Sequence, residues 1–213
     1  MDELELLKKD WKKQDENYPR LSYDQIYKML WKKSSSIVKW IFVISIVEFL
    51  FWGVITIFFA DNEYWNEMER LHLKEFTIVS YLIGYAITFY FIYRFYKNYV
   101  KISSTDDVAS LMRNIIKTRK TVKYYIGYVL ISTAITMLVM TYFIFHYHSL
   151  NSPVEDVASY SFTPTQWLIF IGILILFMIV FLGIIWLFYR LLYGILLRRL
   201  HRNYKELQKL EME

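Results

Sequence analysis

Four long apolar segments constrain the fold of this chain more than any other feature. Each approaches or exceeds the ~20 residues that an α-helix needs to cross the ~30 Å hydrocarbon core of a bilayer. They cover residues 40–60, 76–93, 124–145 and 167–189, and none of them contains a proline. Because lipid offers the backbone no hydrogen-bond partner, continuous runs of this kind predict helices rather than barrel strands. We therefore expect an all-α, polytopic membrane protein with four transmembrane helices.

The distribution of Lys and Arg predicts how these helices are oriented. Of the 25 Lys and Arg, 23 fall in residues 1–39, 94–123 and 190–213, and the other two are Arg70 and Lys74. Loops rich in Lys and Arg stay in the cytoplasm, so we expect both termini there and two short loops outside. We therefore expect the chain in a cytoplasmic (inner) membrane, with its basic residues near anionic lipid head groups. Topology accounts for the basic residues, so we expect no nucleic-acid partner.

Aromatic residues gather where the predicted spans end. Tyr125 and Tyr189 would lie at the inner interface, and Trp65 and Trp167 at the outer one. Tyr and Trp are enriched at membrane interfaces because each has an apolar body and a polar tip. This placement explains much of the 20% aromatic content without a ligand.

The basic segments are patterned as amphipathic cytoplasmic helical extensions of the four-helix bundle. Ser22 and Gln25 form a predicted capping box, and Ser103-Ser-Thr-Asp-Asp107 offers a second N-cap. The apolar faces of these helices could pack on one another or dock a cytoplasmic protein partner. The expected division is an N-terminal segment 1–39, a transmembrane domain 40–193 that includes the helical loop 94–123, and a helical tail 194–213.

Glu48 is the one acidic residue inside a predicted span. It follows Lys39 by nine residues, which at ~1.5 Å per residue puts it ~13 Å deeper, near the middle of the membrane. An ionised carboxylate is costly at that depth, so we expect Glu48 to be protonated and hydrogen-bonded. It could act as a proton relay or a solute-site carboxyl, or it could fix helix packing. Matching depths suggests four hydroxyl partners: Thr88, Ser132, Thr133 and Thr136.

Small residues predict where the helices pack. Gly172, Gly183 and Gly194 are spaced by eleven, so they drift by only ~20° per step around the fourth helix. Gly84 and Thr88, with Ser80, form a row of small residues at four-residue spacing on the second span. Small side chains let helices approach closely in lipid, within one chain or in a homo-oligomer.

The composition excludes several kinds of site. The absence of Cys excludes disulfides, thiol nucleophiles and Cys-ligated metals. No Gly lies in a phosphate-cradling motif. His72, His146 and His148 fall on the predicted outer side, where they could bind a divalent metal with nearby acids or simply form a polar interfacial loop. We expect no catalytic set, no cofactor and no resident metal.

The N-terminal residues carry a resemblance to a known family. The chain reads Leu4-Glu-Leu-Leu-Lys-Lys-Asp-Trp-Lys-Lys, then Tyr18-Pro, then Lys32-Lys-Ser-Ser-Ser-Ile-Val-Lys-Trp. This resembles an uncharacterised family of small bacterial four-span integral membrane proteins, some of which are labelled beta-carotene 15,15'-monooxygenase. The residues do not support that label, since carotenoid cleavage oxygenases are β-propellers with four His on iron, and here His201 lies apart from the other three. The N-terminal segment also loosely resembles membrane-tethered regulators such as anti-sigma factors.

Two functions follow from these observations. The first is a non-enzymatic membrane protein that acts as a scaffold or regulator through its cytoplasmic helices, because the outer loops are short and no catalytic set converges. The alternative is a membrane-embedded enzyme, or a small-solute or proton carrier, that uses Glu48. This alternative includes the carotenoid oxygenase activity that the family label names.

Overall fold

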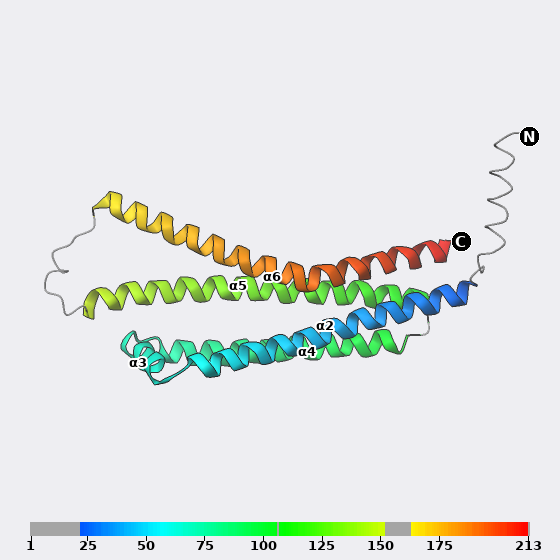
Figure 1. The fold of residues 1–213 in the computed structure, drawn as a ribbon, viewed down its shortest axis with the longest axis horizontal. Coiled ribbons are helices and arrows are strands. Elements are labelled where there is room, and N and C mark those ends of the chain that lie inside the picture. Colours follow the sequence, from blue (N-terminus) through cyan, green and yellow to red (C-terminus); the bar gives the residue numbers. More distant parts are fainter. Residues whose placement is uncertain (1–21, 106, 152–162, 213) are drawn as a thin grey trace, which may run out of the picture.

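The computed structural model describes residues 22–105, 107–151 and 163–212, with only the backbone described for residues 145 and 147–151 (Figure 1). Within these ranges the chain is helical and contains no strand, which confirms the expected all-α class. Its five helices are α2 (Tyr23–Phe59), α3 (Asn62–Arg70), α4 (Lys74–Ser103), α5 (Val108–Asn151) and α6 (Pro164–Met212).

Four of these helices, α2, α4, α5 and α6, are long and apolar enough to cross a membrane. With 37 residues, α2 is about 55 Å long, and with 49 residues α6 is about 73 Å long. Both therefore extend well beyond the ~30 Å of a hydrocarbon core. They run unbroken across residues 39–40 and 193–194, so the predicted domain boundaries fall inside continuous helices. The predicted loop 94–123 consists of the end of α4, a short turn and the start of α5.

Two predicted helix starts are confirmed. The Gln25 amide donates to Ser22 Oγ at 3.4 Å, and the Ser22 amide donates to Gln25 Oε1 at 2.9 Å, which completes the capping box of α2. At the start of α5, Asp107 Oδ2 accepts from the Ser110 amide at 3.0 Å. Hydrogen bonds from the backbone amides of this first turn hold the pKa of Asp107 below its usual value.

The short helix α3 was not predicted from the sequence. Asp61 caps it by accepting from the Tyr64 amide at 2.8 Å. The turn into α4 passes through His72, whose φ of 54° is the one positive φ among the described non-glycine residues. Leu71 and Leu73, on either side of His72, are buried and hold this turn against the bundle.

The four long helices run alternately up and down. Figure 1 shows α2 beside α4 and α5 beside α6, with the start of α2 and the end of α6 at the same end of the molecule. Contacts between α4 and α5 and between α2 and α6 close the bundle. Toward the opposite end α6 diverges from α5 (Figure 1).

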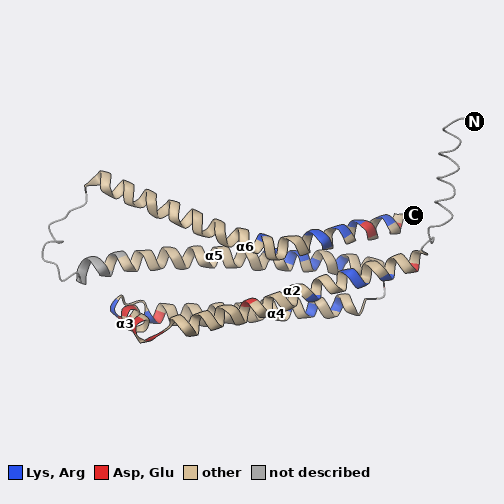
Figure 2. Cartoon of the chain, viewed as in Figure 1, with Lys and Arg blue, Asp and Glu red and all other residues tan. Residues whose placement is uncertain are grey.

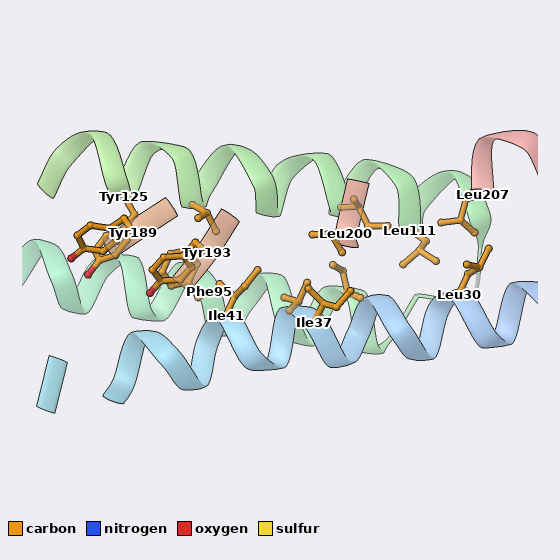
Figure 3. Packing of buried hydrophobic residues seen from close by; sticks show 14 residues of the cluster. Leu30, Ile37, Ile41, Phe95, Leu111, Tyr125, Tyr189, Tyr193, Leu200 and Leu207 are labelled. Carbon is orange, nitrogen blue, oxygen red and sulfur yellow. The ribbon is translucent and has the colours of Figure 1, made fainter. Parts of the chain in front are cut away.

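Most of the described Lys and Arg gather at the end that holds the C-terminus, which we call the basic end (Figure 2). The buried core lies in the same half of the bundle. Figure 3 shows it running from Tyr125, Tyr189 and Tyr193 to Leu30 and Leu207.

Two buried pairs of polar side chains cross this core. Asn98 Nδ2 donates to Thr121 Oγ1 at 3.2 Å, and Asn203 Nδ2 donates to Ser34 Oγ at 3.1 Å. In addition, Trp31 Nε1 donates to the carbonyl of Ile102 at 2.9 Å, which ties α2 to the end of α4. These bonds satisfy polar groups that would otherwise be buried at a cost. The bonds of Asn203 and Trp31 also join helices that are not consecutive in the chain.

The other half of the bundle exposes large apolar side chains. Phe58 is 80% exposed on α2, and Leu168 and Ile173 are 72% and 62% exposed on α6. Contiguous apolar surface of this kind is rare on soluble monomers and marks an interaction with a membrane or a protein.

Candidate functional site

Glu48 lies where α2 meets α5 and α6, and it is only 7% exposed. The Tyr125 hydroxyl donates to Oε1 at 2.8 Å, and the Tyr189 hydroxyl donates to the same oxygen. The Tyr193 hydroxyl donates to Oε2 at 3.0 Å. We call these four residues the Glu48–tyrosine cluster.

The helical repeat places the three tyrosines around this carboxyl group. Tyr189 and Tyr193 are four residues apart on α6 and so share a face, with their rings stacked at a centroid distance of 6.0 Å. Tyr125 of α5 meets both rings edge-on, at 6.0 and 6.2 Å. Phe91 and Phe95 of α4 pack against Tyr125 at 5.3 and 5.7 Å. The ring contacts hold the three hydroxyl groups in position around the Glu48 carboxyl group.

Three members of the cluster, Glu48, Tyr125 and Tyr189, line a cavity of about 670 Å³. Ligand pockets in proteins usually measure about 300–1,000 Å³. Glu48 is the one charged group among the twenty lining residues, which come from α2, α4, α5 and α6. Ten of the twenty are aromatic: Phe49, Phe51, Trp52, Tyr81, Tyr85, Tyr125, Tyr128, Phe181, Phe188 and Tyr189. The cavity is therefore an apolar, aromatic space with one acidic position.

The hydroxyl groups that bond Glu48 differ from those expected. The sequence suggested Thr88, Ser132, Thr133 or Thr136, whereas the observed donors are the three tyrosines. Thr88 donates instead to the Gly84 carbonyl at 2.8 Å, and Ser132 donates to the Val129 carbonyl at 3.0 Å. Thr88, Ser132 and Thr133 line the cavity wall, while Thr136 lies outside the lining.

The reason for this difference is the length of the tyrosine side chain. Matching Cα depths suits short hydroxyl side chains, but a tyrosine carries its hydroxyl group beyond a whole ring. Tyr125 and Tyr189 were predicted to lie at the inner interface, where a tyrosine needs no protein partner. The signal for the Glu48 partners on α6 is the four-residue spacing of Tyr189 and Tyr193, which places two phenol groups on one face of the helix.

The predicted packing glycines lie in open surroundings within this chain. A Cβ atom built on Gly84, Gly172 or Gly183 would meet no atom within 4 Å. At Gly194 the nearest atom is Cγ of Arg190, at 3.6 Å, on the same helix. These glycines mark no close helix crossing inside the protomer, and their role in packing stays a prediction. Gly84 has a different place, because it lines the cavity.

The structure describes the side chains of two of the three candidate metal-binding histidines. His72 lies in the turn before α4, and the His146 ring stacks on Tyr142 of the same helix at 5.9 Å. The side chain of His148 lies outside the described residues. Among the residues that are described, no group of three or more His, Cys, Asp or Glu could hold a metal ion.

His201 lies far from these, at the basic end. Arg119 Nη1 is 2.8 Å from His201 Nδ1, so α5 and α6 are linked by this pair. Desolvation, together with the positive charges of Arg119 and Lys205, lowers the pKa of His201 below the usual 6.5. The neutral ring with an unprotonated Nδ1 accepts the Arg119 hydrogen bond.

Comparison with known proteins gives a family but no described function. A family model described as a domain of unknown function, DUF8845, matches residues 24–212. The match covers all four long helices and the Glu48–tyrosine cluster. No curated protein and no solved structure matches the chain.

Proposed function

We propose that this chain, which belongs to the DUF8845 family, is a membrane protein that binds a small, largely apolar molecule within the bilayer. The observation that carries this proposal is the aromatic cavity of about 670 Å³ with a buried carboxyl group at its side. Apolar lining with a few convergent polar groups is the usual composition of a ligand site. The ligand's polar end would contact the Glu48–tyrosine cluster, and its body would lie against the rings.

Charge and exposure support insertion in a membrane. The exposed apolar side chains of α2 and α6 would be covered by lipid tails. The asymmetry of 23 against 2 in Lys and Arg favours the basic end in the cytoplasm, on the inner side of a bacterial cytoplasmic membrane. In this orientation the basic end would also lie near anionic head groups.

The packing at the basic end favours this function over docking through the apolar helix faces. The apolar faces of α5 and α6 at the basic end include four residues that are each 0% exposed: Leu111, Ile115, Leu200 and Leu207. A partner could not reach them unless the core opened. A scaffold or regulator that works through the charged outer surface of the basic end remains our second candidate. It is supported by the exposed side chains of residues such as Lys32 and Arg113.

The test is the binding of a neutral fluorescent aromatic probe, 1-aminoanthracene, to the protein in lipid nanodiscs. Gly84→Phe would place a ring inside the cavity, because a Cβ atom at Gly84 meets nothing within 4 Å. Gly172→Phe is the matched control, since Gly172 is equally open but lies outside the lining.

We expect saturable binding to the wild type and to Gly172→Phe. Binding to Gly84→Phe should be at least about tenfold weaker, or about 1.4 kcal/mol. Equal binding to all three proteins, or fluorescence no greater than that of empty nanodiscs, would overturn the proposal.

A further inference from the structure

The charge of the cavity defines its ligand more closely. Resting on the function proposed above, we infer that the ligand is a lipophilic organic cation, of the quaternary ammonium or phosphonium type, with Glu48 as its counter-ion. Three observations support this class: the one acidic side chain in the described lining, the incompletely enclosed carboxyl group of Glu48 and the aromatic walls.

Glu48 is the one acidic residue among the twenty described residues of the lining, and none of those twenty is Lys, Arg or His. A buried carboxylate without an opposite charge is costly, even where hydroxyl groups donate to it. A cationic ligand would supply the opposite charge as Glu48 releases the proton expected on it, whereas an anionic ligand would find no opposite charge in the lining.

The Glu48 carboxyl group is not fully enclosed by its donors, so a cation can approach it without donating a hydrogen bond. A carboxylate has about four acceptor positions. Oε1 accepts from Tyr125 and Tyr189, while Oε2 accepts only from Tyr193 among the described donors. The tyrosines therefore fix the carboxyl group without surrounding it completely, and Glu48 still contributes to the cavity surface.

The walls suit a cation whose charge is spread over an apolar body. Trp52, Tyr85 and Tyr128 line the cavity, and the faces of Trp and Tyr rings attract cations most strongly where water is excluded. A compact primary ammonium group is strongly hydrated and would lose that hydration on entry. Quaternary cations lose less, and aromatic cages are the usual site for them.

Two ions of one shape and opposite charge test this inference. Tetraphenylphosphonium and tetraphenylborate both place four phenyl rings around one atom. Binding of each is measured by equilibrium dialysis against wild-type protein in nanodiscs of uncharged phosphatidylcholine, with empty nanodiscs as the blank. We expect saturable binding of tetraphenylphosphonium at least about tenfold tighter than that of tetraphenylborate. The wild-type comparison decides the sign of the charge without any substitution.

Variants then place the cation in the cavity. Glu48→Gln should weaken phosphonium binding at least about tenfold, while Glu48→Asp, which keeps the charge, should weaken it less. Gly84→Phe should abolish it, and Gly172→Phe should leave it unchanged.

The outcomes separate the inference from the proposed function. If 1-aminoanthracene binds but tetraphenylphosphonium does not, or if the borate binds equally well, the cation inference fails and the proposed function stands. Phosphonium binding that is insensitive to Gly84→Phe also overturns the inference, because the ion would then occupy another site. If none of the three probes binds, both fail.

Discussion

Removing the Tyr193 hydroxyl group should destabilise the protein only while Glu48 is present. Tyr193 is 0% exposed and donates to Glu48 Oε2 at 3.0 Å. Leaving a buried polar group without its hydrogen bond costs about 1–3 kcal/mol, whereas interhelical bonds in membranes average about 0.6 kcal/mol because the unfolded chain finds other partners. We therefore expect Tyr193→Phe to lower the free energy of unfolding by about 1.5 kcal/mol. In the background of Glu48→Met, which has no carboxyl acceptor, the same substitution should cost close to nothing.

The measurement is a double-mutant cycle: each protein is unfolded in mixed micelles of dodecyl sulfate, and tryptophan fluorescence reports the fraction that is unfolded. The control is Tyr27→Phe, since Tyr27 donates to the Thr105 carbonyl at 3.3 Å and lies about 31 Å from Glu48 along α2. Its effect should add to that of Glu48→Met within about 0.5 kcal/mol. A coupling energy between Glu48 and Tyr193 below about 0.5 kcal/mol would refute the hydrogen-bonded cluster.

Three further predictions follow from the core, from His201 and from the two candidate functions. Leu200→Ala should lower the free energy of unfolding by about 2–5 kcal/mol in the same assay, because Leu200 is 0% exposed. Leu168→Ala, at a 72% exposed position, should change it very little, and equal losses would contradict the described core. Because folding lowers the pKa of His201, its contribution to stability should be complete above pH 6.5 and should decline as the pH falls below that value. The difference in unfolding temperature between pH 5 and pH 8 should be larger for the wild type than for His201→Gln. Identical differences would exclude a contribution of His201 to the pH dependence of stability. In cells, Glu48→Gln should abolish the function of the protein, whereas deletion of residues 2–21 should reduce that function only slightly. The reverse result would favour the scaffold or regulator.

The sequence was sufficient to predict the four long helices, but neither their lengths nor the short helix α3. Apolar runs locate four segments because lipid-facing and buried positions are both apolar, and Ser22 and Asp107 mark helix starts through local hydrogen bonds. The continuity of α2 and α6 past the apolar runs could not be predicted in the same way. It depends on the packing of residues such as Ile37 and Leu200, which are distant in sequence.

The site was predicted only in part. Glu48 was identified because a lone acid in an apolar run is exceptional. The spacing of Tyr189 and Tyr193 shows that they share a face of α6, but not that this face meets Glu48, since the direction of a ring depends on how α5 and α6 rotate against α2. The cavity is equally invisible in the sequence, because its volume results from four helices and belongs to no single segment.

The most direct test of the account is photolabelling with a small apolar carbene source, 3-trifluoromethyl-3-phenyldiazirine, followed by peptide mass spectrometry. A molecule in the cavity would react with residues of its lining, such as Tyr128 and Glu48. Binding in the cavity predicts adducts on these residues. Excess 1-aminoanthracene should suppress these adducts, and they should be absent in Gly84→Phe. Adducts confined to outward-facing positions such as Ile173, and unchanged by Gly84→Phe, would contradict it.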